Sequence, residues 1–111
     1  MRAILAPAVL ALATASAALA EDTALDQKVR RFLERNRGAW RDMNVPWVDG
    51  QILHDLVVEG RHTRALEIGT STGHSSIWIA WGLSKTGGKL TTIEIDPSRH
   101  AEALRNLEEA G

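Results

Sequence analysis

The feature that most constrains the fold is a short apolar run that ends abruptly in a glycine-containing turn. The run Ala65–Ile68 is mostly apolar, a turn of small residues follows over 69–73, and apolar residues then recur at helical spacing from Ile77 to Trp81. A short run of this kind is typical of a buried parallel strand. The order strand, turn and helix predicts a ligand crevice, because glycine lacks a Cβ and the first N–H groups of a helix are free.

A second strand with a carboxylate near its end is predicted further along the chain. The segment Lys89-Leu-Thr-Thr-Ile-Glu-Ile-Asp-Pro is rich in β-branched residues. Glu94 follows the turn by about 20 residues, where Rossmann-like folds place an acid that accepts both ribose hydroxyls. Asp96 and Pro97 predict the start of the next helix, as N-cap and first helical residue. We therefore predict an α/β fold with a parallel sheet and flanking helices.

Three segments carry a resemblance to a known family. They read Met43-Asn-Val-Pro, Glu67-Ile-Gly-Thr-Ser-Thr-Gly-His-Ser and Thr92-Ile-Glu-Ile-Asp-Pro. In order and approximate spacing they resemble class I S-adenosylmethionine-dependent methyltransferases, and most closely the small O-methyltransferases of the catechol O-methyltransferase type. The resemblance implies a Rossmann-like methyltransferase fold, S-adenosyl-L-methionine as cofactor, and O-methylation of a small molecule as function.

The resemblance also assigns residues to the methionine end of the cofactor. Asn44 and Val45, and more weakly Met43, would contact the methionine part. Gly69 would let this end approach the backbone, and Glu67 would hold the ammonium group directly or through water. For Glu67, a capping or ion-pairing role is the alternative.

At the other end, Glu94 would bind the ribose and Ile95 would pack against the adenine. His74 is predicted to be structural. The complete set of predicted cofactor-binding residues is Asn44, Val45, Glu67, Gly69, Thr70, Ser71, Gly73, Ser75 and Glu94.

Residues 1–20 have the pattern of a secretory signal peptide. Arg2 is followed by an apolar run and by Ala18-Leu-Ala20, a small-x-small cleavage site, before acidic residues begin at Glu21. An uncleaved anchor and a misassigned start are the alternatives. Cleavage would imply an exported protein, periplasmic or secreted. Without it the protein would be cytoplasmic or membrane-anchored, and membrane contact is expected only through this segment.

The rest of the chain divides into a helical cap region, 21–62, and the first half of the cofactor-binding domain, 63–111. Helices are predicted over 22–38, 48–59 and 98–110, besides the one after the turn, which Gly82 and residues 86–88 are predicted to close. The predicted inward residues are Leu25, Val29, Phe32 and Leu33, then Ile52, Leu53, Leu56 and Val57, then Ala101, Leu104 and Leu107. Trp78 and Trp81 are predicted to pack in the core.

Composition excludes several other functions. The formal net charge is −1, so a nucleic-acid partner is not expected. The chain has no cysteine, which excludes disulfides and thiolate metal sites. His54 and His62 lack partners at ligand spacing and are predicted to be surface residues.

The predicted sheet has only its first two strands, fewer than the family's sheet. We therefore expect a fragment of a longer reading frame, truncated after the second strand and its helix and inactive alone. The family's catalytic lysine and its metal-binding acids, usually for magnesium, would lie beyond Gly111. No residue here is given a catalytic or metal-binding role, and the oligomeric state is left open.

Two other functions compete with this prediction. One is a dinucleotide-dependent oxidoreductase, whose fingerprint G-x-G-x-x-G differs from the spacing of Gly69 and Gly73. The other is a non-catalytic exported fragment or binding module.

Overall fold

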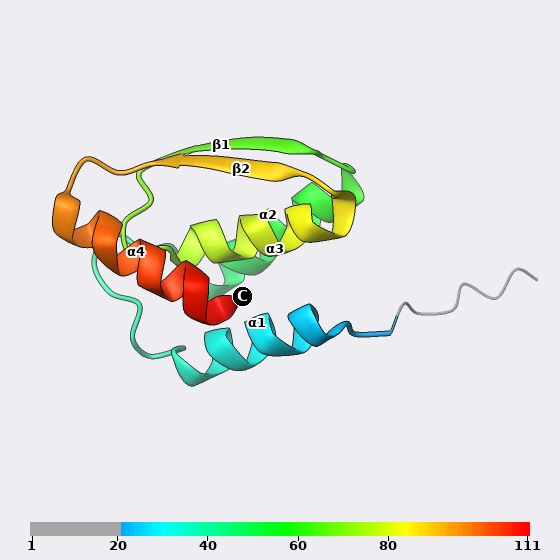
Figure 1. Cartoon of the computed structure of the whole chain (residues 1–111), viewed down its shortest axis with the longest axis horizontal. Coiled ribbons are helices and arrows are strands. Elements are labelled where there is room, and N and C mark those ends of the chain that lie inside the picture. Colours follow the sequence, from blue (N-terminus) through cyan, green and yellow to red (C-terminus); the bar gives the residue numbers. More distant parts are fainter. Residues whose placement is uncertain (1–20) are drawn as a thin grey trace, which may run out of the picture.

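The two predicted strands pair in parallel, and the helices of residues 21–111 lie on one side of that pair (Figure 1). The computed structural model describes residues 21–111, so the predicted signal peptide lies outside the described residues. The elements in order are α1 Ala24–Arg35, α2 Trp47–Glu59, β1 Arg64–Ile68, α3 His74–Thr86, β2 Lys89–Ile93 and α4 Pro97–Ala110. None of these helices is long and apolar enough to cross a membrane.

The two faces of the sheet differ in cover. Leu66 lies opposite Thr91 in the parallel register, and Ile68 lies opposite Ile93. Ala65 packs with Leu90 against the apolar cluster of α2 and α3, whereas Leu66 and Ile68, on the opposite face, are 67% and 74% exposed. Within residues 21–111 the helices therefore cover one face of the sheet only.

Helix α3 is the centre of the core. On one side, Ile77, Trp78 and Trp81 pack against an apolar stripe of α1. On the other, Ile79 and Leu83 pack against Val57 of α2 and against the sheet. The predicted stripe of α1 is confirmed, since Val29, Phe32 and Leu33 are buried and Leu25 packs against them. The prediction that Trp78 and Trp81 belong to the core is also confirmed.

Two glycines let α2 and α3 approach closely. A Cβ at Gly50 would clash with the indole of Trp78, and one at Gly82 would come within 3.0 Å of Val57 Cβ. The prediction that Gly82 closes its helix is wrong. Helix α3 continues to Thr86 and ends at Gly87, whose φ of 72° is in the left-handed region. Gly82 serves helix packing instead.

Two predicted helix faces are also partly wrong. Ile52 and Leu56 of α2 are 51% and 57% exposed, because α2 packs on α3 through the neighbouring face that carries Gly50, Leu53 and Val57. In α4 the buried residues are Ala103 and Ala110, and Leu107 packs beside them. Ala101 and Leu104 are exposed. The small side chain of Ala103 lets α4 lie against the glycine turn, where a Cβ on Gly73 would be 3.4 Å from it.

A buried carboxylate fixes the start of α1. Thr23 is the N-cap, and Asp26 completes the capping box. Asp26, 5% exposed, also accepts a hydrogen bond of 2.6 Å from Trp81 Nε1 and pairs with Lys85. These bonds, that of Lys85 first, hold the pKa of Asp26 far below its ordinary value. Asp26 therefore ties α1 to the C-terminal half of α3 as an ionised group.

Candidate cofactor crevice

A cleft of about 470 Å³ opens beyond the carboxyl ends of β1 and β2. This is where open α/β sheets bind ligands. Its lining residues are Met43, Ile68, Gly69, Ser71, Glu94, Ile95, Asp96 and Arg99. The structure thus brings together three predicted site residues, Gly69, Ser71 and Glu94, with Met43 and Ile95, whose contacts were also predicted.

The glycine turn is shaped by its backbone conformation. Gly69 has φ 91° and Gly73 has φ 102°, values that L side chains rarely adopt. Nothing lies within 4 Å of a Cβ built on Gly69, so the backbone here is open to a ligand. The N–H groups of Gly69 and Thr70 both donate to the carbonyl of Ile93, at 2.8 and 3.2 Å. The turn is therefore fixed to the end of β2.

Glu94 is an oriented, ionised carboxylate. Its Oε1 accepts from the N–H of Asp96 at 3.0 Å, and its Oε2 accepts from the N–H of Ser71 at 2.7 Å. These two bonds, that of Asp96 first, hold the pKa of Glu94 below its ordinary value. Because two backbone donors fix both oxygens, the carboxylate is held at the cleft in one orientation and keeps its charge at neutral pH.

Arg99 and Asp96 line the crevice and were missed by the sequence reasoning. Arg99 Nη1 donates to Ser71 Oγ at 3.1 Å. Asp96 caps α4 as predicted and accepts from Ser98 and Arg99 N–H groups. The available signal was their place in the sequence, because the first turn of a helix that follows a strand carboxyl end faces the same crevice.

Three other predicted residues lie together beneath the crevice rather than in its lining. Glu67 accepts hydrogen bonds from Ser75 Oγ at 2.6 Å, from Thr92 Oγ1 at 2.7 Å, and from the hydroxyl of Ser76. Thr70 Oγ1 lies 2.5 Å from Thr92 Oγ1 and is part of the same network. Three hydroxyls therefore occupy the oxygens of Glu67, and the network joins β1, β2 and the start of α3.

The segment before α2 contacts the turn from the other side. Asn44 Nδ2 donates to Thr72 Oγ1 and to the carbonyl of Arg41, both at 2.8 Å. The Oδ1 atom of Asn44 is buried and has no hydrogen-bond partner among the described residues. Val45 presents its carbonyl to His74 Nδ1 at 2.8 Å. Neither residue lines the cleft, but Met43 beside them does.

The residues at the crevice fit a nucleoside. An ionised carboxylate suits two ribose hydroxyls, since each oxygen can accept an O–H donor. Ile95, 96% exposed, offers an apolar surface to a base. The buried, unpartnered Oδ1 of Asn44 lies outside this lining, although the neighbouring residue Met43 is part of it. No group of three His, Asp or Glu side chains able to hold a metal ion occurs in residues 21–111.

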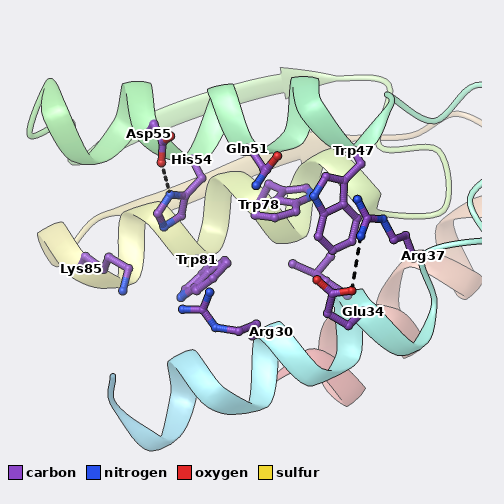
Figure 2. Close-up of a pocket in the computed structure, with 11 residues that line it drawn as sticks. Arg30, Glu34, Arg37, Trp47, Gln51, His54, Asp55, Trp78, Trp81 and Lys85 are labelled. Atoms are coloured by element: carbon purple, nitrogen blue, oxygen red, sulfur yellow. Dashed lines mark hydrogen bonds and ion pairs between the residues drawn. The ribbon is translucent and has the colours of Figure 1, made fainter. Parts of the chain in front are cut away.

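A second cavity, of about 430 Å³, lies between α1, α2 and α3 (Figure 2). None of the predicted site residues lines it. Of its charged lining groups, Arg37 pairs with Glu34 at 3.7 Å, and Lys85 pairs with the buried Asp26, which lies outside the lining. Arg37 also stacks on Trp47, at 4.4 Å from the ring centroid. This cavity lies among the helices, away from the carboxyl ends of β1 and β2, so the crevice remains the candidate cofactor site.

Comparison with solved structures identifies the fold. Among solved structures, the fold is similar to the O-methyltransferase from Bacillus cereus in complex with SAH, with a TM-score of 0.62, 34% identity, and coverage of 77% of this chain and 39% of the other. It is similarly close to the O-methyltransferase TomG from Streptomyces achromogenes in complex with SAM, with a TM-score of 0.61, 37% identity, and coverage of 78% and 39%. The fold is that of the Rossmann-like methyltransferases.

The family follows from the sequence match. The O-methyltransferase family model matches residues 14–111, and the chain belongs to this family. A catechol O-methyltransferase from Niastella koreensis is 48% identical over 62 residues, which are 56% of this chain and 28% of the relative. The chain thus matches about a quarter to two fifths of the length of its relatives. Neither comparison supports the oxidoreductase or the non-catalytic module.

Proposed function

We propose that the described residues bind S-adenosyl-L-methionine in the crevice, and that the whole protein transfers the methyl group to an oxygen of a small molecule. The observation that carries the proposal is Glu94, an ionised carboxylate fixed by two backbone N–H groups beside the open Gly69. Two structural relatives, the enzymes in complex with SAH and SAM, support it.

In this proposal the residues at and behind the crevice take different parts of the cofactor. Glu94 accepts the ribose hydroxyls and Ile95 packs on the adenine. Gly69 and Ser71 line the passage for the methionine end, with Asn44 and Val45 behind it. Glu67 acts through its hydroxyl network, reaching the ammonium by a water molecule or by exchange of one hydroxyl partner, since three hydroxyls occupy it now.

The chemistry follows from the cofactor. When bound, S-adenosylmethionine supplies a methyl group on a positive sulfur, which is activated toward an oxygen nucleophile. The chain's own residues hold this methyl donor in one orientation. Alignment of donor and acceptor makes a large contribution to the rate of such a transfer. The acceptor and its deprotonation are proposed to depend on residues outside 21–111, as is any divalent metal.

Isothermal titration of the 111-residue chain with S-adenosylhomocysteine tests the proposal. Glu94→Gln removes the charge and one acceptor, and should weaken binding by about ten-fold or more, which corresponds to about 1.4 kcal/mol. Glu102→Gln, at an exposed acid of α4 outside the crevice lining, is the control and should bind as wild type. Equal affinity of the two variants, or preference for NAD over S-adenosylhomocysteine, would contradict the proposal.

We also propose that residues 1–20 direct export and are then removed. The support is the signal-peptide pattern of the sequence. N-terminal sequencing of the protein recovered from the expressing cells tests this, with a start at Glu21 as the expected result. An intact Met1 on all recovered protein would contradict it.

A further inference from the structure

The imidazole of His74 joins the glycine turn to the segment before α2. His74 is the first residue of α3 and is 1% exposed. Its Nδ1 lies 2.8 Å from the carbonyl oxygen of Val45, and its Nε2 lies 3.0 Å from Trp78 Nε1. The His74 ring therefore contacts the backbone of the segment before α2 and a side chain of its own helix, α3.

These partners fix the protonation state of the ring. An indole N–H only donates, so Nε2 of His74 must accept and carries no proton. The carbonyl of Val45 only accepts, so Nδ1 must carry the proton and donate. The neutral Nδ1–H tautomer, assigned here from its partners, satisfies both bonds. The imidazolium keeps only the bond to Val45, because its second N–H, on Nε2, would face the N–H of Trp78.

Two indoles of the segment 40–47 pack against the His74 ring. Trp40 stacks on His74 with ring centroids 4.5 Å apart and planes 12° apart. Trp47 lies 6.3 Å away at the other end of the segment. Because Pro46 restricts the backbone of Val45 to extended conformations, the Val45 carbonyl is presented rigidly. The segment 40–47 is thus held at both ends and at its centre.

This segment carries residues that face the cofactor crevice. Met43 lines the crevice, and Asn44 donates to Thr72 of the glycine turn at 2.8 Å. We propose that His74 is a positioning residue of the cofactor site, whose neutral ring holds residues 40–47 against the glycine turn. The imidazolium would keep a donor to Val45, but it would set a second N–H against that of Trp78 in a buried site. Protonation of His74 therefore displaces the ring, releases this segment and weakens cofactor binding. The inference rests on the function proposed above.

The surroundings of the ring favour its neutral form. Burial lowers the pKa of His74, and the bond to the Val45 carbonyl opposes this in part. The described ring contacts, from the segment (Trp40, Val45 and Trp47) and from α3 (Trp78), are all uncharged. Behind these contacts lie Arg37, which stacks on Trp47 at 4.4 Å, and His54, whose ring centroid is 6.4 Å from that of Trp78. Glu94 remains ionised as the pH falls, because its pKa is lowered.

Two variants and one control test the inference. His74→Phe keeps an aromatic ring and removes both hydrogen bonds. His74→Gln supplies one amide N–H donor and one carbonyl acceptor, and it does not titrate. His62→Gln removes an exposed histidine whose side chain does not contact the segment, and should behave as wild type.

The first measurement needs no ligand. Limited trypsin digestion reports on the peptide bond after Arg41, within the segment. His74→Phe should be cleaved there about ten-fold faster than wild type, as expected when a contact worth about 1.4 kcal/mol is lost and cleavage follows local opening. His74→Gln and His62→Gln should be cleaved as slowly as wild type. Equal cleavage of His74→Phe and wild type, with circular dichroism showing both folded, would overturn the inference.

The second measurement is S-adenosylhomocysteine affinity from about pH 8 to about pH 5, with the His74 ring followed by NMR. Wild-type affinity should fall as the ring titrates, with a midpoint below that of an exposed histidine. His74→Gln should bind within about three-fold of wild type at high pH and show no such fall. A fall that persists in His74→Gln would overturn the inference. Absence of any binding by wild type would overturn the proposed function, while the digestion would still decide the role of His74.

Discussion

Helix α3 is tied to the rest of the chain at two points that differ in charge. Near its start, neutral His74 bonds to Val45 and to Trp78. Near its end, ionised Asp26 accepts from Trp81 and from Lys85. Each contact uses an indole N–H, but one centres on an uncharged ring and the other on a buried charge. The neutral contact borders the segment 40–47 and is the one that we propose a proton releases, whereas the charged contact of Asp26 persists to much lower pH.

Removing the charge at Asp26 should have the largest effect. Asp26→Asn leaves Lys85 without its partner. Breaking a fully buried pair costs about 3–5 kcal/mol, and the loss here should lie toward or below the lower end, because the Lys85 side chain is 33% exposed. Urea denaturation followed by circular dichroism measures the loss. A loss below that of the His74→Phe variant, which removes both bonds of the neutral contact, would show that the charged contact is not the stronger of the two.

Overpacking the neighbourhood of the neutral contact should cost less. A Cβ at Gly50 meets the rigid indole of Trp78, so Gly50→Ala should destabilise the protein by about 1–3 kcal/mol. Because Trp78 is the donor to His74, this variant should also speed tryptic cleavage after Arg41. Gly38→Ala is the control, since nothing lies within 4 Å of a Cβ there. Unchanged cleavage in Gly50→Ala would show that the indole is not needed to hold the ring.

The two contacts should respond differently to pH. The pKa of His74 is lowered from 6.5 in the folded state, so the unfolded chain binds the proton more readily. Its contribution to stability is present above about pH 6.5 and is lost as the pH falls through that value toward the folded pKa. Asp26 has a folded pKa far below 3.8, so its contribution is present above that value and is lost only at lower pH.

Urea midpoints between about pH 7 and about pH 4 measure this difference. His74→Gln should reduce the loss of stability on acidification over this range, whereas the control His62→Gln should not. If His74→Gln and wild type lose stability in parallel, the protonation of His74 makes no contribution.

The smallest effect is expected at the surface of α1. Asp22 pairs with Arg30 at 3.1 Å, but both side chains are more than half exposed. Asp22→Asn should therefore change the free energy of unfolding by at most about 1 kcal/mol, and less at high salt. If Asp22→Asn lowered the free energy of unfolding as much as Asp26→Asn does, burial would not explain the difference between the two ion pairs.

Local patterns predicted much of this arrangement. The strand Ala65–Ile68, the turn of Gly69 and Gly73, and the capping pair Asp96 and Pro97 were found because propensity, periodicity and capping are local properties of a chain. The crevice was predicted for a similar reason, since parallel strands end at the same edge. The roles of the site residues toward the cofactor stay predictions, because the distances describe the protein and not its ligand.

What the sequence by itself determined is the order of strands and helices, the α/β class, and the segments that meet at the crevice. Only the tertiary structure decided which faces of α2 and α4 are buried, since this depends on where Gly50, Gly82 and Ala103 let helices approach. It also decided the bonds of Asp26 and His74, whose partners lie 55 and 29 residues away. Such contacts have no local signature, because a polar residue is buried only where distant donors and acceptors satisfy it.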